Sequence, residues 1–172
     1  EIEIPIANRA ANGPLAMISP ANTYVGLTHS GPGTAAGEPG KYYPTGKRNY
    51  ARVIPHDLFQ GTADAQFAFQ ERKVTKCAVL NDNQTYGQGV ARAFADEFKK
   101  QGGEVVVDQA WDAKQPDYTA LFQSIQAAGA DCVFFGGIYD NNSTRGTSGQ
   151  VLQSRQLVQH QLILPSLLKQ AM

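Results

Sequence analysis

Hydroxyl and amide side chains gather at one predicted turn near the start of the chain. Ser19, Asn22 and Thr23 follow the apolar run 14–18, which predicts a short buried strand ending at this turn. In open α/β sheets, small ligands bind beyond the carboxyl ends of strands, where backbone N–H groups and short polar side chains converge. A threonine offers both a donor and an acceptor at such a place. These residue types are suited to binding a small polar molecule, and they include no catalytic acid or base.

Catalytic and metal-binding motifs are absent from the sequence. His29, His56 and His160 are scattered, with no carboxylate spacing typical of a proton relay. There is no Walker loop, no Gly-x-Ser-x-Gly elbow and no His-Glu-x-x-His pair, and Gly87-Gln88-Gly89 lacks the third glycine of a dinucleotide-binding loop. We therefore expect a protein that is not an enzyme and that uses no metal and no cofactor.

The charge balance also limits the partners. The 172 residues carry 15 basic and 15 acidic side chains, so the formal net charge is zero and no nucleic-acid partner is expected. No apolar run approaches the ~18 residues that a membrane span requires. Residues 1–5 do not form a signal peptide, which a mature or fragmentary chain would lack in any case.

Two cysteines, Cys77 and Cys132, both lie inside apolar runs. Their spacing matches no zinc-ligand pattern, so we expect two buried free thiols that behave as small hydrophobic side chains. A disulfide is the less favoured alternative. If the two strands are neighbours in a parallel sheet, the Cβ directions would suit a bridge poorly.

Residues 74–137 alternate between strand and helix patterns. Strands are predicted at 76–80, 104–107 and 131–135. Helices are predicted at 89–100, and from 116–117, with Asp117 as N-cap, to 127–129. Their apolar faces consist of Val90, Ala91, Phe94 and Phe98, and of Tyr118, Leu121, Phe122 and Ile125. Short links between these elements predict an α/β fold with a doubly wound parallel sheet.

The first third of the chain is less regular. A helix is expected in residues 1–12, strands at 15–18 and 50–54, and a further helix at 57–69. Between the two strands, the glycine- and proline-rich stretch 31–49 is interpreted as an irregular surface loop. Two strands alone do not form a stable lobe, so this region is expected to be an appendage or the later part of a larger lobe.

Five motifs, in this order along the chain, resemble one protein family. They are Ile4-Pro5-Ile6-Ala7-Asn8, then Ser19-Pro20-Ala21-Asn22-Thr23 with Leu27-Thr28, then Arg52-Val53-Ile54-Pro55 with Asp57 and Gln60-Gly61, then Thr85-Tyr86-Gly87-Gln88-Gly89, and Gly136-Gly137-Ile138-Tyr139. Over residues 1–142 the chain resembles type I periplasmic binding proteins, and most of all the branched-chain amino-acid binding components of ABC transporters. The resemblance implies two doubly wound α/β lobes on a hinge, which close over one ligand like a flytrap.

The same resemblance implies a division of the chain. Residues 1–56 correspond to the later part of the first lobe, which would be incomplete, and residues 57–142 to the second lobe. Residues 143–172 fall outside the family pattern as an atypical tail. In it, 143–149 is interpreted as a flexible polar linker, and a helix is expected between 150 and Leu164. The acidic residue that the family usually pairs with the ligand ammonium is not found after Tyr139.

The resemblance assigns the polar turn to the ligand. In the family, the turn that matches Ala21, Asn22 and Thr23 contacts the ammonium and carboxylate groups of an amino acid. The contacts would come from the Ala21 backbone carbonyl and from the hydroxyl and N–H of Thr23. Hydrogen bonds to charged groups contribute about 1.5–3 kcal/mol each.

Three more residues are assigned to the ligand cleft by the resemblance. Tyr86 and Tyr139 each follow a strand of the second lobe, and each would offer a flat apolar wall with one hydroxyl. Asp57 lies where the chain crosses between the lobes. It would line the cleft or serve as the N-cap of the following helix.

The implied function is capture of a small, branched-chain amino acid for an ABC transporter permease in the membrane. The implied location is the periplasm or the extracellular face, with a lipid anchor as one form of attachment in the full-length protein. The alternatives are a receptor-type or regulatory ligand-sensing domain of the same fold, and a cytosolic binder. A DNA-binding headpiece, a transmembrane segment or a secretion signal elsewhere in the gene would distinguish them.

Overall fold

The computed structural model describes residues 2–31, 33–110, 112, 115, 117–138 and 160–163. The chain divides into two compact units, Glu1–Asp57 and Leu58–Met172. The division falls at the first residues of helix α2 (Asp57–Gln66), and each unit has its own sheet and its own core.

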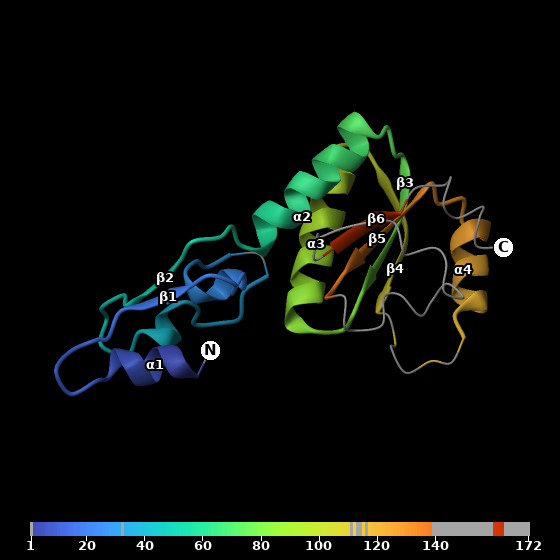
Figure 1. Cartoon of the computed structure of the whole chain (residues 1–172). Coiled ribbons are helices and arrows are strands. Elements are labelled where there is room, and N and C mark those ends of the chain that lie inside the picture. Colours follow the sequence, from blue (N-terminus) through green and yellow to red (C-terminus); the bar gives the residue numbers. More distant parts are fainter. Residues whose placement is uncertain are drawn as a thin grey trace. The chain divides into compact units, whose positions relative to one another are not determined.

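The second unit is built on a four-stranded sheet with the strand order β4-β3-β5-β6 (Figure 1). Strands β3 (Lys76–Asn81), β4 (Glu104–Ala110) and β5 (Cys132–Gly136) run parallel, as the alternating strand and helix patterns predict. Every residue of β5 is buried, as expected for a parallel strand covered by helices on both faces. The predicted α/β fold with a doubly wound parallel sheet is confirmed.

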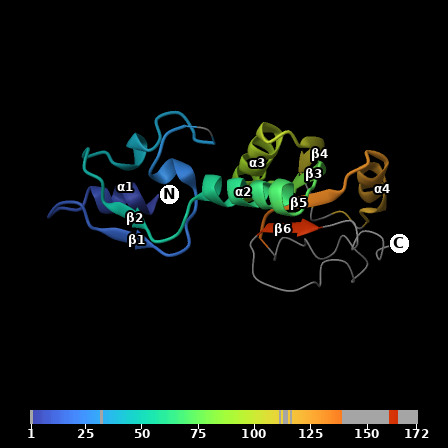
Figure 2. The ribbon, with the colours of Figure 1, turned by 90° about the horizontal axis from the view of Figure 1, so that it is seen from above.

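The side chains of β3 and β5 alternate between two apolar layers. On one face, Cys77, Val79, Cys132 and Phe134 pack against α2 and α3 (Thr85–Lys100). On the other face, Ala78, Leu80, Val133 and Phe135 pack against residues of α4 (Thr119–Ala127). Figures 1 and 2 both place α2 and α3 on one side of the sheet and α4 on the other.

The helices of the second unit carry the predicted apolar faces but begin at other residues. Helix α3 starts at Thr85, four residues before the predicted start, because the Asp82 carboxylate accepts a hydrogen bond from the Gln84 N–H and organises the preceding turn. Helix α4 starts at Thr119, with Tyr118 at the N-cap position. The prediction of Asp117 as the N-cap is therefore wrong by one residue; Asp117 precedes the N-cap, and its Oδ1 accepts hydrogen bonds from the N–H and hydroxyl of Thr119. Helix α2 continues into a π-helical turn, η3 (Phe67–Glu71), in agreement with the predicted helix 57–69.

The first unit is built around a two-stranded parallel sheet of β1 (Met17–Ser19) and β2 (Tyr50–Arg52). Both predicted strands are present, but each is shorter than expected, and the prediction that the first is buried is wrong, because Ile18 in β1 is exposed. Helix α1 (Glu3–Asn8) is also shorter than the predicted range 1–12. It ends where Asn8 turns inward, because the Asn8 amide bonds the Lys47 carbonyl, the Asn49 side chain and Thr45. The core of the first unit consists of Ile4, Leu27, Tyr42, Tyr43 and Tyr50.

The interpretation of 31–49 as an irregular surface loop is wrong for its second half. A short 3-10 helix, η2 (Gly40–Tyr42), follows Glu38, and both Tyr42 and Tyr43 belong to the core of the first unit. Glu38 and Asn49 are buried polar residues. A second 3-10 helix, η1 (Val25–Leu27), lies between the polar turn and this stretch. Glycine and proline content predicts the irregular backbone correctly, but it does not show that aromatic side chains turn inward.

The expected helix between 150 and Leu164 is wrong where the structure describes it. Residues His160–Ile163 form strand β6, which pairs antiparallel with β5, placing Ile163 opposite Val133 and His160 opposite Gly136. The open edge of β5 provides backbone partners that local sequence patterns do not reveal. The predicted linker 143–149 and Tyr139 lie outside the described residues.

Candidate ligand-binding site

The polar turn begins where β1 ends. The Ser19 hydroxyl oxygen accepts hydrogen bonds from the backbone N–H groups of Ala21 (3.3 Å) and Asn22 (2.9 Å). A serine that bonds to the backbone two and three residues further on fixes a local turn. Ser19 therefore shapes the turn, and the following residues present their groups at the carboxyl end of the strand.

Arg52, the last residue of β2, holds this turn from the neighbouring strand. It lies opposite Ser19 in the parallel register. Its guanidinium donates to the carbonyl oxygens of Asn22 (3.2 Å) and Tyr24 (2.9 Å) and to the Thr28 hydroxyl (2.5 Å). The planar donor set of arginine suits several acceptors at once, which a lysine could not match. In the sequence, Arg52 stands out only as part of a family motif, and its positioning role depends on the pairing of β1 with β2.

After these contacts, several hydrogen-bonding groups of the turn remain. The Thr23 carbonyl accepts a hydrogen bond from the Asp57 N–H (3.1 Å). Within the described part of the chain, the N–H and hydroxyl of Thr23 and the carbonyl of Ala21 have no hydrogen-bond partner. Thr23 is only 7% exposed, whereas Ala21 and Asn22 are exposed. The structure thus places Ala21, Asn22 and Thr23 at the carboxyl end of β1.

Asp57 is the first residue of α2, and its side chain is buried, with 1% exposure. Its backbone N–H donates to the Thr23 carbonyl, so the start of α2 is hydrogen-bonded to the polar turn. A carboxylate in the first turn of a helix is stabilised by the helix dipole.

In the second unit, Asp82 joins the carboxyl ends of two strands. It follows β3 directly, and its N–H donates to the Gly136 carbonyl of β5 (3.0 Å). Its Oδ1 accepts from the Gln84 N–H (3.0 Å), and its Oδ2 accepts from the Ile138 N–H (3.4 Å). Asp82 is a buried residue, with 8% exposure. It therefore acts as a structural clamp at the edge where ligands bind in α/β sheets.

Two glycines let the first turn of α3 lie against the end of β5. A Cβ on Gly87 would collide with the Asp82 carboxylate and the Gly136 carbonyl, and a Cβ on Gly136 would collide with the Gly87 carbonyl. Only residues without a side chain permit this approach of two backbones. Packing thus explains why the first residue of Gly87-Gln88-Gly89 is a glycine. No dinucleotide is needed to account for it.

Tyr86 lies in the first turn of α3 and is half-buried. Its ring packs against the core layer shared by α2, α3 and the sheet. Its hydroxyl donates to the Gln60 side-chain oxygen of α2 at 3.2 Å. These contacts fix Tyr86 within the second unit.

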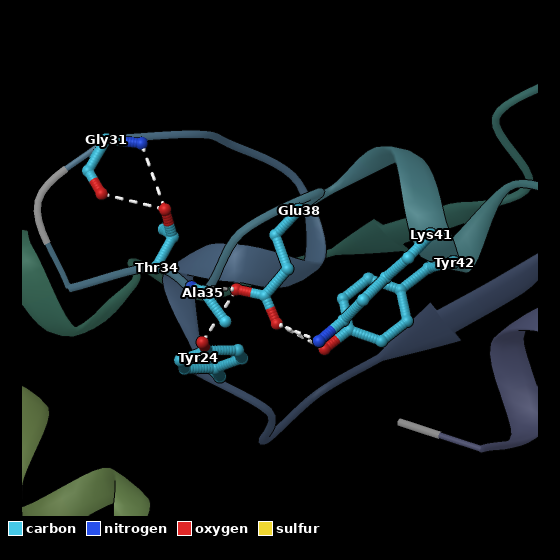
Figure 3. Close-up of polar contacts among 7 residues, drawn as sticks. All are labelled: Tyr24, Gly31, Thr34, Ala35, Glu38, Lys41 and Tyr42. Atoms are coloured by element: carbon cyan, nitrogen blue, oxygen red, sulfur yellow. Dashed lines mark hydrogen bonds and ion pairs between the residues drawn. The ribbon is translucent and has the colours of Figure 1, made fainter.

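A buried carboxylate, which the sequence analysis does not single out, organises the stretch beyond the turn. Oε1 of Glu38 accepts from the Tyr42 hydroxyl (2.6 Å) and pairs with the Lys41 ammonium (2.7 Å). Oε2 accepts from the Tyr24 hydroxyl (2.7 Å) and the Ala35 N–H (2.8 Å). Figure 3 shows the carboxylate among these four donors. Because Tyr24 follows Thr23 in the chain, this cluster also supports the polar turn.

The stability of the first unit is predicted to depend on acid pH through Glu38. Burial alone would raise the pKa of this carboxyl group. The hydrogen bonds from Lys41, Tyr42, Tyr24 and the Ala35 N–H outweigh it and lower the pKa from 4.5 to about 2. Because the folded state has the lower pKa, the stabilisation is complete above pH 4.5 and is lost as pH falls toward 2. The slope reaches at most ~1.4 kcal/mol per pH unit for one group.

This pH dependence can be measured by hydrogen exchange of peptides that cover residues 24–43, between pH 6 and pH 2.5. Protection corrected for the intrinsic exchange rate should fall below pH 4.5 in the wild type. The Glu38→Gln variant has no carboxyl group at this position, so its protection should change less over the same range. Equal pH dependence in both proteins would contradict the assignment to Glu38.

Among the described residues, no group of three or more histidine, cysteine, aspartate or glutamate side chains is placed to hold a metal ion. No helix in the same ranges is long and apolar enough to cross a bilayer. The predicted site residue Tyr139 is outside the described residues.

Parallel sheets with polar turns at the carboxyl ends of their strands define an α/β protein of the kind that binds small ligands. A family model described as periplasmic binding protein matches residues 17–144. The match covers well over half of the chain, and the chain belongs to this family, whose members are solute-binding proteins. The resemblance to type I periplasmic binding proteins of the branched-chain amino-acid group is confirmed.

Similar proteins agree with the family. A Leu/Ile/Val/Thr-binding protein of Salmonella typhimurium is 33% identical over 105 residues, which is 60% of this chain and 27% of the relative. An amino acid binding protein of Pseudomonas aeruginosa is 34% identical over 88 residues, 51% of this chain and 24% of the relative. The matched segments thus span about a quarter of the length of these relatives.

A solved structure extends the similarity to the fold. The ABC transporter substrate-binding protein of Desulfitobacterium hafniense, in complex with Leu, is 26% identical to this chain. The superposition has a TM-score of 0.61 and covers 83% of this chain and 38% of that protein.

Proposed function

We propose that this chain belongs to an extracytoplasmic solute-binding protein that captures a small amino acid, most suitably a branched-chain one, for ABC import. The observation that carries the proposal is the set of unused hydrogen-bonding groups in the polar turn. The Ala21 carbonyl is an acceptor, and the N–H and hydroxyl of Thr23 are donors. An amino acid carries an ammonium group, which needs acceptors, and a carboxylate, which needs donors.

The polar turn fits this ligand class for a second reason. Arg52 satisfies the carbonyl oxygens of Asn22 and Tyr24, and the Asp57 N–H satisfies that of Thr23, so the backbone acceptor of residues 21–24 that remains is the Ala21 carbonyl. Ser19 and Arg52 hold the turn in place before any ligand arrives. Preorganised groups lose little conformational freedom on binding, which favours affinity.

The remaining site residues are part of the proposal as a second surface. In it, Tyr86, Tyr139 and Asp57 are assigned to the ligand on the basis of the family motifs. Residues 1–56 belong to the later part of one lobe and 57–142 to the other, whereas 143–172 fall outside the family pattern, although His160–Ile163 in this range pairs with β5. Ligand binding shifts the equilibrium from open to closed lobes because the ligand contacts both surfaces only in the closed form.

The names of the relatives support the ligand and the partner. The Salmonella relative is a binding protein for Leu, Ile, Val and Thr, and the Desulfitobacterium structure is a complex with Leu. On this basis the proposed ligand is an aliphatic amino acid and the proposed partner is an ABC permease. The proposed location is outside the cytoplasmic membrane, in the periplasm or at the extracellular face.

Replacing Thr23 with valine is predicted to weaken amino-acid binding about 5- to 150-fold. Valine keeps the shape of threonine but removes the hydroxyl, and a hydrogen bond to a charged group contributes about 1–3 kcal/mol. The dissociation constant for leucine is measured by isothermal titration calorimetry on the gene product that contains this chain. Thr23→Ser keeps the hydroxyl and is expected to stay within about threefold of the wild type.

Thr34→Val serves as the matched control for Thr23→Val. Among the described residues, the Thr34 hydroxyl forms hydrogen bonds only with the N–H and carbonyl of Gly31, in an exposed turn of the same unit. The control should bind leucine as tightly as the wild type. Equal affinity of Thr23→Val and Thr34→Val would remove the Thr23 hydroxyl from the site.

A further inference from the structure

Two buried thiols lie in contact at the centre of the second unit's sheet. Cys77 of β3 and Cys132 of β5 are partners in the parallel register, and both are 0% exposed. Both are free thiols, as the sequence predicts. The Cys77 S–H donates toward the Cys132 sulfur, with 3.0 Å between the two Sγ atoms. The two sulfur atoms therefore lie in contact across the parallel strand pair.

The backbone geometry of the pair is compatible with a covalent bridge. Neighbouring strands lie ~4.8 Å apart, and directly paired residues have Cα separations near this value. Disulfides occur at Cα separations of roughly 4.4–6.8 Å, with an S–S bond of ~2.05 Å. The sulfurs thus need to approach by about one ångström, without any change of register. A β-bulge between Cys77 and Ala78, on the side of β3 that faces β4, provides a local irregularity that can absorb such a shift.

We propose that Cys77 and Cys132 form an intramolecular disulfide that joins β3 to β5. A thiolate of the pair attacks one sulfur of an oxidising disulfide, which can be a small molecule or a protein, and releases the first thiol. The second cysteine then attacks the mixed disulfide, forms the Cys77–Cys132 bond and releases the second thiol. Two protons leave the cysteines, and two electrons reduce the oxidising disulfide to two thiols.

The bridge forms before the core closes, because the folded pair is shielded. Neither sulfur is accessible to an oxidant in the native structure. The interaction with the Cys77 side chain and burial both raise the pKa of the Cys132 thiol, so the reactive thiolate is scarce once the unit is folded. An extracytoplasmic location, as proposed above, is one where oxidising disulfides act on folding chains.

A closed bridge would tie together the two central strands of the doubly wound core. The cysteines are 55 positions apart, and α3, β4 and α4 lie between them. Cross-linking them restricts the unfolded chain over this long loop, which stabilises the folded state. The oxidised protein should therefore melt several degrees above the reduced protein.

The test is a redox titration of the wild-type chain during refolding in mixtures of reduced and oxidised glutathione. Free thiols are trapped with acid, alkylated in denaturant and counted by mass spectrometry. Hydrogen exchange of β3 and β5 confirms that these strands are protected in the refolded protein. The same titration in 6 M guanidinium measures the pair without native structure. We expect the bridge to form at a glutathione ratio at least ~100-fold more reducing in native buffer than in guanidinium.

The outcomes separate the bridge from other thiol chemistry. Peptide mapping should find one species, 2 Da lighter than the reduced chain, with Cys77 linked to Cys132 in the monomer. The Cys132→Ala variant retains one thiol and should yield only a glutathione adduct. Protected β3 and β5 with two free thiols, two glutathione adducts, a disulfide-linked dimer, or equal titrations in native buffer and guanidinium would each overturn the proposal.

Discussion

Replacing Phe94 with alanine is expected to lower the free energy of unfolding of the second unit by about 3–5 kcal/mol. Phe94 is 0% exposed, and its ring stacks on Phe134 of β5 with 3.9 Å between centroids and on Phe98 of α3 with 5.5 Å. The variant removes one of the aromatic contacts between α3 and the sheet and leaves a cavity in the close-packed layer. Urea unfolding followed by far-ultraviolet circular dichroism measures the loss.

Phe67→Ala is the matched control for this variant. Phe67 belongs to the helical segment η3 of the same unit, but its side chain is 51% exposed. Its replacement should change the free energy of unfolding by less than about 0.5–1 kcal/mol, as for most surface positions. If both phenylalanine variants unfold at the same urea concentration, the assignment of Phe94 to the core is contradicted.

Replacing Glu38 with glutamine is expected to destabilise the first unit by about 2–4 kcal/mol. The carboxylate accepts from four donors, on Tyr24, Ala35, Lys41 and Tyr42. A glutamine has the same shape, but its NH₂ group would face two donors in place of an acceptor and would leave them unsatisfied. The variant also removes the charge that Lys41 neutralises. Hydrogen exchange of peptides covering residues 24–43, at pH 7, measures the local free energy of opening.

Glu3→Gln makes the same chemical change at an exposed position of the first unit. It should leave exchange in residues 24–43 unchanged. Similar protection in the Glu38→Gln and Glu3→Gln variants would show that the Glu38 cluster does not hold this stretch together.

Local patterns predict the second unit well because its strands and helices are regular. The apolar runs of β3 and β5 and the faces of α3 and α4 follow the periods of strand and helix, and the family motifs lie where these elements end. The polar turn is also evident in the sequence, because Ser19, Asn22 and Thr23 follow a short apolar run.

Contacts between distant residues explain what the sequence does not reveal. Arg52 holds the polar turn only because β2 pairs with β1 in one particular register. The burial of Glu38 becomes evident only in the fold, where the hydroxyl groups of Tyr24 and Tyr42 donate to its carboxylate. Likewise, strand β6 depends on the open edge of β5, and its own residues show no strand alternation strong enough to predict it.

The most direct test of the central claim is a calorimetric titration of the gene product that contains this chain, with a panel of small molecules. The panel includes leucine, isoleucine, valine, two polar amino acids and a sugar of similar size. We predict saturable heat with at least one aliphatic amino acid, loss of affinity in Thr23→Val, and no heat with the sugar. Absence of heat with every amino acid, from protein shown to be folded, would contradict the proposal that this family member captures an amino acid.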